Sequence, residues 1–239
     1  DYGKSEPKSE VKTLVKTFTT YGMDEQERLI FHFAINTLEP ELQKYVQAVT
    51  IVSNESYKKH ESFKSSGHAH VRPGEICLLR GCDESQTIIS WWHEAGHIWR
   101  WRLPAIANDE WNEISGKVYA NTYYYDKTTA GDYPQNGILR LHGVANHDED
   151  MVIYLASIYA YVHLGINEFA GVDWNDPRYL KKIEFLYKWG AISEGVLEAA
   201  KTIPIRAEYK TKDPRQQSSG FLFYSYFDLF DARKLVTYK

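Results

Sequence analysis

The spacing of apolar positions along the chain predicts a protein built mainly of helices. Apolar side chains three and four positions apart are typical of one helix face, whereas short runs of β-branched residues are typical of strands. We expect helices over residues 10–20, 24–36, 38–45, 83–102, 108–125, 147–164, 177–189 and 193–202. We expect strands over residues 46–53 and 70–80, and loops over 54–69 and 127–138. The pattern therefore predicts a helix-rich α+β fold.

The second expected strand, over residues 70–80, is interrupted by Pro73 and Gly74. Proline cannot donate a ladder hydrogen bond, so we expect this strand at the edge of a small mixed sheet. The helix that follows it should lie beside that edge. No linker divides the 239 residues, so we expect a single domain, with residues 1–10 as a flexible arm.

The composition and the net charge limit the classes of molecule that we expect the protein to bind. Hydrophobic residues make up 43% of the chain and aromatic residues 15%, which is enough for a sizeable core and argues against disorder. The formal net charge of −4 gives no reason to expect binding to nucleic acid or to an anionic membrane. No apolar run approaches the roughly 18 residues that a membrane span needs. The composition does not indicate an oligomeric state.

Two cysteines, Cys77 and Cys82, are separated by four residues that include a glycine suited to a turn. A disulfide across this bend and two unpaired thiols are both compatible with the sequence. Because a second Cys pair is missing, the spacing is not a zinc signature. A disulfide would indicate an oxidising compartment, and the chain begins at Asp1, as a processed protein or a fragment would. We therefore expect a secreted or extracellular protein.

The run WHEAGH at residues 92–97 matches the pattern H-E-x-x-H. On a helix, His93 and His97 lie on one face and can bind the same Zn²⁺, while Glu94 can reach a water on the metal. The small residues Ala95 and Gly96 would let another segment approach the helix closely. The alternative is an amphipathic helix whose two histidines are surface residues. The helical context favours a metal site.

A catalytic zinc usually has three protein ligands and a water. The extended three-histidine pattern needs His at position 103, where the chain has Leu103, so we expect a carboxylate. Glu149 opens the apolar helix expected over 147–164, although acidic residues are also common there because of the helix dipole. Glu113 follows His97 by 16 residues, but it is equally compatible with a solvated helix face.

These motifs resemble those of the gluzincins, zinc peptidases with two histidines from H-E-x-x-H and a downstream glutamate. The chain is most similar to the catalytic domains of the anthrax lethal factor and Pro-Pro endopeptidase group. In that group, a helix that begins with an Asn-x-x-Glu-Asp type sequence supplies the zinc-binding glutamate, and the run NHDED at residues 146–150 fits that pattern. The resemblance covers roughly residues 25–165 and favours Glu149 over Glu113.

The resemblance implies a ligand set, a general base and a substrate class. Zn²⁺ would be bound by His93, His97 and Glu149, and Glu94 would be the general base that activates water. The partner would be a protein or peptide substrate, cut by an endopeptidase. Two alternatives remain: a non-catalytic peptidase-like binding module, and a domain in which zinc is only structural.

The chain departs from these relatives at two positions. Seven residues before the zinc glutamate the relatives have a Tyr that donates to the oxyanion, and this chain has His142. An imidazole can take that role, an ordinary loop histidine is the alternative, and Tyr133 and Tyr154 are other possible donors. The relatives also carry an acid four residues after the ligand, where this chain has Ile153. The carboxylate that orients a ligand histidine would then come from elsewhere, such as Asp150.

Overall fold

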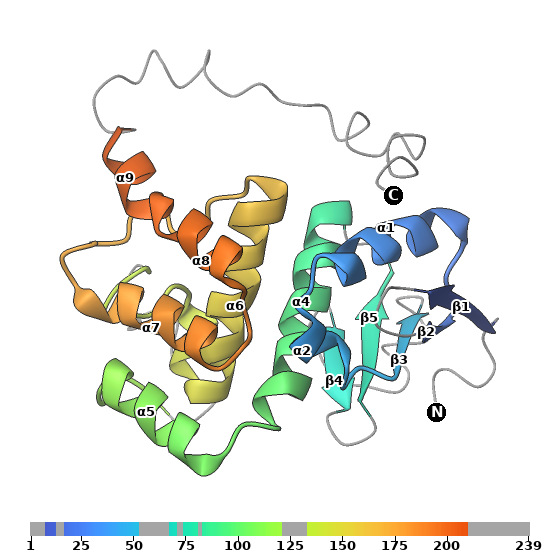
Figure 1. The fold of residues 1–239 in the computed structure, drawn as a ribbon, viewed down its shortest axis with the longest axis horizontal. Coiled ribbons are helices and arrows are strands. Elements are labelled where there is room, and N and C mark those ends of the chain that lie inside the picture. Colours follow the sequence, from blue (N-terminus) through green and yellow to red (C-terminus); the bar gives the residue numbers. More distant parts are fainter. Residues whose placement is uncertain are drawn as a thin grey trace. The chain divides into compact units, whose positions relative to one another are not determined.

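The computed structural model describes residues 8–12, 17–52, 67–70, 74–80, 83–120 and 133–209 (Figure 1). The chain divides into two compact units, Asp1–Lys201 and Thr202–Lys239. In the second unit, the described residues form helix α9 (Thr202–Tyr209), and all that follows concerns the first unit. The single domain over 1–239 stays a prediction.

A five-stranded mixed sheet forms one part of the first unit. The central strands β2, β3 and β5 run parallel, and β1 and β4 pair antiparallel at the two edges. The strand order is β1-β2-β3-β5-β4. With the helices described below, this sheet confirms the predicted helix-rich α+β class. The strands are β1 (Lys8–Lys12), β2 (Thr17–Tyr21), β3 (Ala48–Val52), β4 (Gly67–His70) and β5 (Glu75–Leu79).

The two N-terminal strands contradict the sequence-based expectation for this region. The helix predicted over 10–20 is wrong, and residues 8–10 of the predicted arm belong to β1, which pairs with β2. In β2, the buried Phe18 and Thr20 alternate with more exposed neighbours, which is the period of a strand. Three threonines in this short run also favour a strand, because β-branched side chains fit a pleated surface.

The strand at the sheet edge also differs from the one expected. Strand β5 begins at Glu75, after Pro73, and lies between β3 and β4 rather than at the edge. Its residues 76–78 are all buried, as is typical of a strand covered on both faces. The edge strand beside helix α4 is β4, most of which was expected to be loop.

The predicted helices are largely confirmed, with small shifts at their ends. Besides the wrong helix over 10–20, the largest difference is the helix expected over 108–125, which starts earlier, after Pro104, and ends at Ser115, where Gly116 adopts a positive φ of 71°. The helices are α1 (Glu25–Asn36), α2 (Pro40–Gln43), α4 (Glu84–Arg100), α5 (Ala105–Ser115), the 3-10 helix η1 (Leu141–Val144), α6 (His147–Leu164), α7 (Pro177–Lys188) and α8 (Glu194–Ala200).

Helix α4 is the central element of this unit. The sheet, α1 and α2 lie on one side of α4, and α6 lies on its other side (Figure 1). Its tryptophans, Trp91, Trp92 and Trp99, are fully buried, and the indole N–H of Trp92 donates to the Ala34 carbonyl at 3.0 Å. Helices α5, α7 and α8 pack against α6.

The contact between α4 and α6 is close at Gly96. A Cβ added there would lie 3.0 Å from Val152 Cγ1 and 3.1 Å from Leu155 Cδ2. This confirms the prediction that Ala95 and Gly96 admit another segment. No helix in the described part of the chain has both the length and the apolar character that a membrane span requires.

Candidate metal centre

Helix α4 places His93 and His97 on one face. Asp83 begins the helix by accepting a hydrogen bond from the Gln86 backbone at 2.9 Å. Residues four apart on a helix lie one above the other, and the Nε2 atoms of the two histidines are 3.1 Å apart. Each side chain is 19% exposed, so the pair lies at an accessible surface rather than in the core.

Helix α6 brings Glu149 to these two histidines. The side chain of Asn146 caps the helix by accepting from the Glu149 backbone N–H at 2.9 Å, which fixes the first turn. Glu149 Oε2 then lies 3.3 Å from His93 Nε2 and 3.5 Å from His97 Nε2. The three predicted zinc ligands therefore meet between α4 and α6, although Glu149 follows His97 by 52 residues in the sequence.

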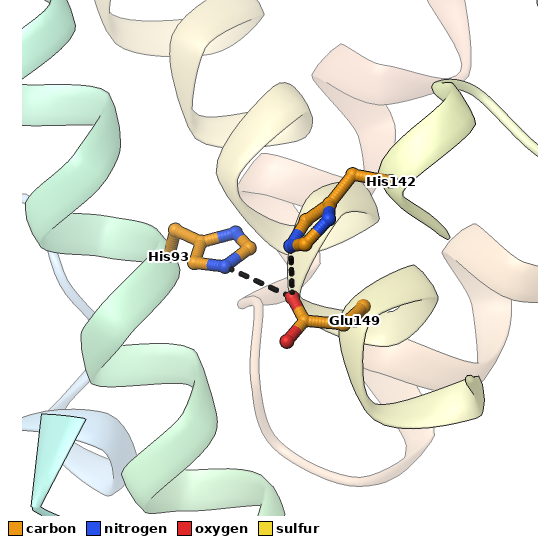
Figure 2. A group of neighbouring side chains, drawn as sticks. All are labelled: His93, His142 and Glu149. Carbon is orange, nitrogen blue, oxygen red and sulfur yellow. Dashed lines mark ion pairs between the residues drawn. The ribbon is translucent and has the colours of Figure 1, made fainter. Parts of the chain in front are cut away.

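His142 completes the group from the 3-10 helix η1. Its Nε2 lies 3.0 Å from the same Glu149 oxygen, and Figure 2 shows it facing His93 across that carboxylate. In the described part of the chain, the ligand atoms of His93, His142 and Glu149 all lie within 4.8 Å of one another. His142, predicted as the oxyanion donor, thus reaches the candidate metal-binding group.

The alternative ligand Glu113 is not part of this group. It is exposed on α5, in the turn that precedes Ser115. The structure therefore brings together the ligand set with Glu149 and not the one with Glu113.

Glu94 is a buried carboxyl beside the group. Glu94 is only 7% exposed. It lies against the start of β4, because a Cβ added to Gly67 would be 3.5 Å from Glu94 Cγ. Burial raises the pKa of Glu94, although the nearby His93 and His97 oppose this effect. A carboxyl with a raised pKa is suited to accept a proton and then to donate it.

The charges of the group favour an ionised Glu149. Burial alone would raise the pKa of Glu149, but hydrogen bonds from His142, His93 and His97 outweigh it and hold this pKa far below its usual range. Burial likewise lowers the pKa of His97, but Glu149 and Glu94 outweigh it, and the net pKa is raised. A carboxylate that collects imidazole donors is a site that attracts a cation.

The donor atoms fit a zinc ion by both chemistry and spacing. Imidazole nitrogen and carboxylate oxygen are common zinc ligands, at about 2.0–2.2 Å. Ligand atoms at the corners of a tetrahedron of that size lie about 3.3–3.6 Å apart. The donor atoms of His93, His97 and Glu149 lie 3.1, 3.3 and 3.5 Å from one another, and His142 Nε2 lies 3.0 Å from Glu149 Oε2.

The two tyrosines considered as oxyanion donors have other partners. The Tyr154 hydroxyl donates to the Gly137 carbonyl at 2.8 Å, and the side chain is fully buried against Trp111 and Phe169. Tyr133 hydrogen-bonds the side chain of Gln135. The geometry leaves His142 as the donor nearest the predicted ligands.

Asp150 does not orient a ligand histidine, contrary to the expectation. It points away from the histidines into the core, where its Oδ2 is 2.5 Å from Lys182 Nζ and accepts hydrogen bonds from Tyr119 and Trp111. Lys182 also donates to the Gly137 carbonyl at 2.8 Å. We call these residues, Asp150, Lys182, Tyr119 and Trp111, the Asp150 cluster.

The buried position of Lys182 has a signal in the sequence, which the predicted site did not include. Lys182 lies on the apolar face of α7 with Tyr179, Ile183 and Leu186, at the spacing of one helix stripe. A lysine within such a stripe must find a buried partner.

Asp148, rather than Asp150, is the carboxylate that acts on a ligand histidine from outside the group. Its Oδ1 lies 2.5 Å from Arg100 Nη2 and 2.8 Å from His147 Nε2. Its charge contributes to the raised pKa of His97. Arg100 follows His97 by one helical turn on α4, so this ion pair also ties α4 to the first turn of α6.

A cavity of about 300 Å³ lies elsewhere, between α1, β5 and the first half of α4. Its apolar wall includes Phe31, Leu78 and Trp91, and Arg80 and Glu27 form an ion pair at its rim. None of its described lining residues is a histidine, and none of them belongs to the candidate metal centre.

A comparison of the chain with protein families, curated proteins and solved structures finds no match. The resemblance to the gluzincins therefore stays a prediction from the motifs, and the two alternatives for Cys77 and Cys82, a disulfide or two unpaired thiols, both stay expectations. Cys77 is buried in β5, whereas Cys82 lies outside the described residues.

Proposed function

We propose that this protein is a zinc-dependent endopeptidase. The observation that carries the proposal is the meeting of His93, His97 and Glu149, from two helices far apart in sequence, beside the buried carboxyl of Glu94. The ligand types and their separations suit zinc better than a hard cation such as Mg²⁺, which prefers oxygen ligands. The secreted or extracellular location stays a prediction.

The residues of this site divide the work of hydrolysis. Zinc, held by His93, His97 and Glu149, would supply a Lewis acid for activating water and polarising a carbonyl. Glu94 accepts the proton of the attacking water on a carboxylate oxygen and passes it to the nitrogen of the leaving amine. The imidazole N–H of His142 donates to the carbonyl oxygen as negative charge develops there, which is worth roughly 10²–10³ in rate.

The sheet edge supports a peptide as the substrate. Among the described strands, β4 pairs with β5 on one side only, and it lies beside α4, which carries the histidines. An extended peptide can add to such an edge through main-chain hydrogen bonds. Gly67, at the start of β4, lies over Glu94, so a peptide along this edge would pass the proposed general base.

The proposal is tested by substituting the general base. We expect Glu94→Gln to keep zinc but to lower the rate of peptide cleavage by about 10³-fold or more, because the proton acceptor is removed while all ligands remain. Cleavage of a mixed peptide library, followed by mass spectrometry, measures this. Glu84→Gln, in the first turn of the same helix, is the matched control and should retain activity. Cleavage by Glu94→Gln at the wild-type rate would contradict the proposal.

A structural zinc site is the second candidate, and one observation favours it. His142 lies as close to Glu149 as the two helical histidines do, so four protein ligands are available. Structural zinc sites are closed by four protein ligands, whereas catalytic sites keep an open position. A wild-type protein that binds zinc, cuts no peptide in the library and admits no small zinc-binding inhibitor would support this candidate.

A further inference from the structure

His142 lies where a metal ligand would lie. Its Nε2 is 3.0 Å from Glu149 Oε2, shorter than the corresponding distances of His93 and His97, which are 3.3 and 3.5 Å. The rings of His93 and His142 are 6.4 Å apart between centroids, and Figure 2 shows both nitrogens directed at one carboxylate oxygen. Three imidazoles thus converge on one carboxylate.

This position is closer than an oxyanion donor requires. A group that only hydrogen-bonds an oxygen on the metal stands one atom farther out, about 4–5 Å from the ion. A ligand stands at about 2 Å, so its donor atom lies about 3.3–3.6 Å from the other ligand atoms. The 3.0 Å between His142 Nε2 and Glu149 Oε2, which is the length of a hydrogen bond, is only slightly shorter than the spacing between ligands of one ion.

The side chain of His142 is more accessible to solvent than those of the two helical histidines, while its backbone is packed closely. The side chain is 47% exposed, against 19% for His93 and for His97. The next residue, Gly143, is held against α6, because a Cβ there would lie 3.3 Å from Asp150 Oδ1 and 3.3 Å from Ile138 Cγ2. A substrate can therefore reach the imidazole of His142 more easily than those of His93 and His97.

We propose that His142 is a fourth, exchangeable metal ligand that closes the centre at rest and leaves it when substrate binds. This inference rests on the proposed function, since it assumes the same metal centre. At rest, His142 would hold the metal together with His93, His97 and Glu149. When a carbonyl oxygen of the substrate took the place of His142, the imidazole would remain within reach and would donate its N–H to that oxygen. One residue thereby serves as a gate and as the oxyanion donor.

The coordination number is measured by zinc X-ray absorption spectroscopy on the full chain loaded with zinc. We expect a fit with three imidazoles for the wild type and two for His142→Ala, and a zinc affinity lowered about tenfold or more in the variant. His32→Ala, which removes an exposed histidine on α1, is the matched control and should leave the count unchanged. His142→Gln provides a second variant if His142→Ala does not fold.

Exchange is tested by adding acetohydroxamate, a small chelator of zinc, to the wild type. We expect the imidazole count to fall from three to two as the hydroxamate oxygens replace His142. Two imidazoles in the untreated wild type would overturn the inference, and so would a count of three that persists with hydroxamate bound.

These outcomes are distinct from a failure of the proposed function. Three exchangeable imidazoles in a protein that cuts no peptide would leave the ligand assignment intact and reject the peptidase. Cleavage that depends on Glu94, together with two imidazoles at rest, would support the peptidase and reject His142 as a ligand.

Discussion

Two consecutive carboxylates at the start of α6, Glu149 and Asp150, lie in opposite settings. Glu149 faces α4 and meets imidazoles that are partly exposed. Asp150 faces α7 and meets Lys182 in an ion pair with 0% exposure on both sides. Successive residues on a helix point about 100° apart, so one turn can supply both a metal ligand and a core anchor.

The difference between the two carboxylates is one of access. The Glu149 group has nitrogen donors that can also bind a metal, and it is open to solvent at His142. The Asp150 cluster is closed, because Lys182 lies over the rings of Trp111 and Tyr154, at 5.1 and 5.0 Å from their centroids. Burial lowers the pKa of Lys182 and raises that of Asp150, and each charge opposes the shift of the other. We infer that Asp150 holds the turn in place, whereas Glu149 is positioned to bind the proposed metal.

The largest effect on stability should come from breaking the Asp150 cluster. We expect Lys182→Met to lower the free energy of unfolding by about 3–5 kcal/mol, because it leaves the Asp150 carboxylate buried without its cation. Urea denaturation followed by tryptophan fluorescence measures this loss.

The double variant Lys182→Met/Asp150→Asn is the control for this substitution. It removes the unpaired charge of the Asp150 carboxylate but keeps an acceptor for Tyr119 and Trp111, so it should recover part of the stability. The folded single variant should still bind zinc, because Glu149 and the histidines are unchanged. A loss below about 1 kcal/mol would show that Asp150 does not anchor the turn.

A smaller loss of stability should follow from adding a methyl group at the close contact between α4 and α6. Gly96→Ala places a Cβ 3.0 Å from Val152 Cγ1, so the helices must separate by a few tenths of an ångström. We expect a loss of about 1–2 kcal/mol in stability, since overpacking outweighs the gain in helix propensity. Zinc affinity should fall as well, because the two helices carry different ligands.

Gly195→Ala is the matched substitution for Gly96→Ala. Gly195 lies in α8, and an added Cβ would meet nothing within 4 Å. Gly195→Ala should therefore raise the free energy of unfolding by about 0.5–1 kcal/mol and leave the zinc affinity unchanged. Equal effects of the two substitutions would show that the contact at Gly96 is not tight in solution.

The sequence predicted the parts of this molecule that depend on local patterns. H-E-x-x-H fixes the relative positions of His93, Glu94 and His97 as soon as the segment is helical. The helix expected over 147–164 has those same ends in the structure, where Asn146 caps its start and Gly165 follows its end in a left-handed conformation.

The features that the sequence did not reveal depend on tertiary contacts. Val11, Leu14, Val15 and Phe18 are spaced as on a helix, yet pairing with neighbouring strands decides the structure of β1 and β2. The proline before β5 suggested an edge, but β4 covers that side. The partner of Asp150, Lys182, lies 32 residues away, and no local pattern joins the two.

The central claim is that Glu149, brought to the histidines of α4, binds the metal. The most direct measurement is the zinc content of purified wild type, Glu149→Ala and Glu113→Ala, determined by mass spectrometry of the metal after dialysis. We predict about one zinc per chain in the wild type and in Glu113→Ala, and a loss of most of it in Glu149→Ala. Zinc retained by Glu149→Ala, or lost from Glu113→Ala instead, would contradict the account.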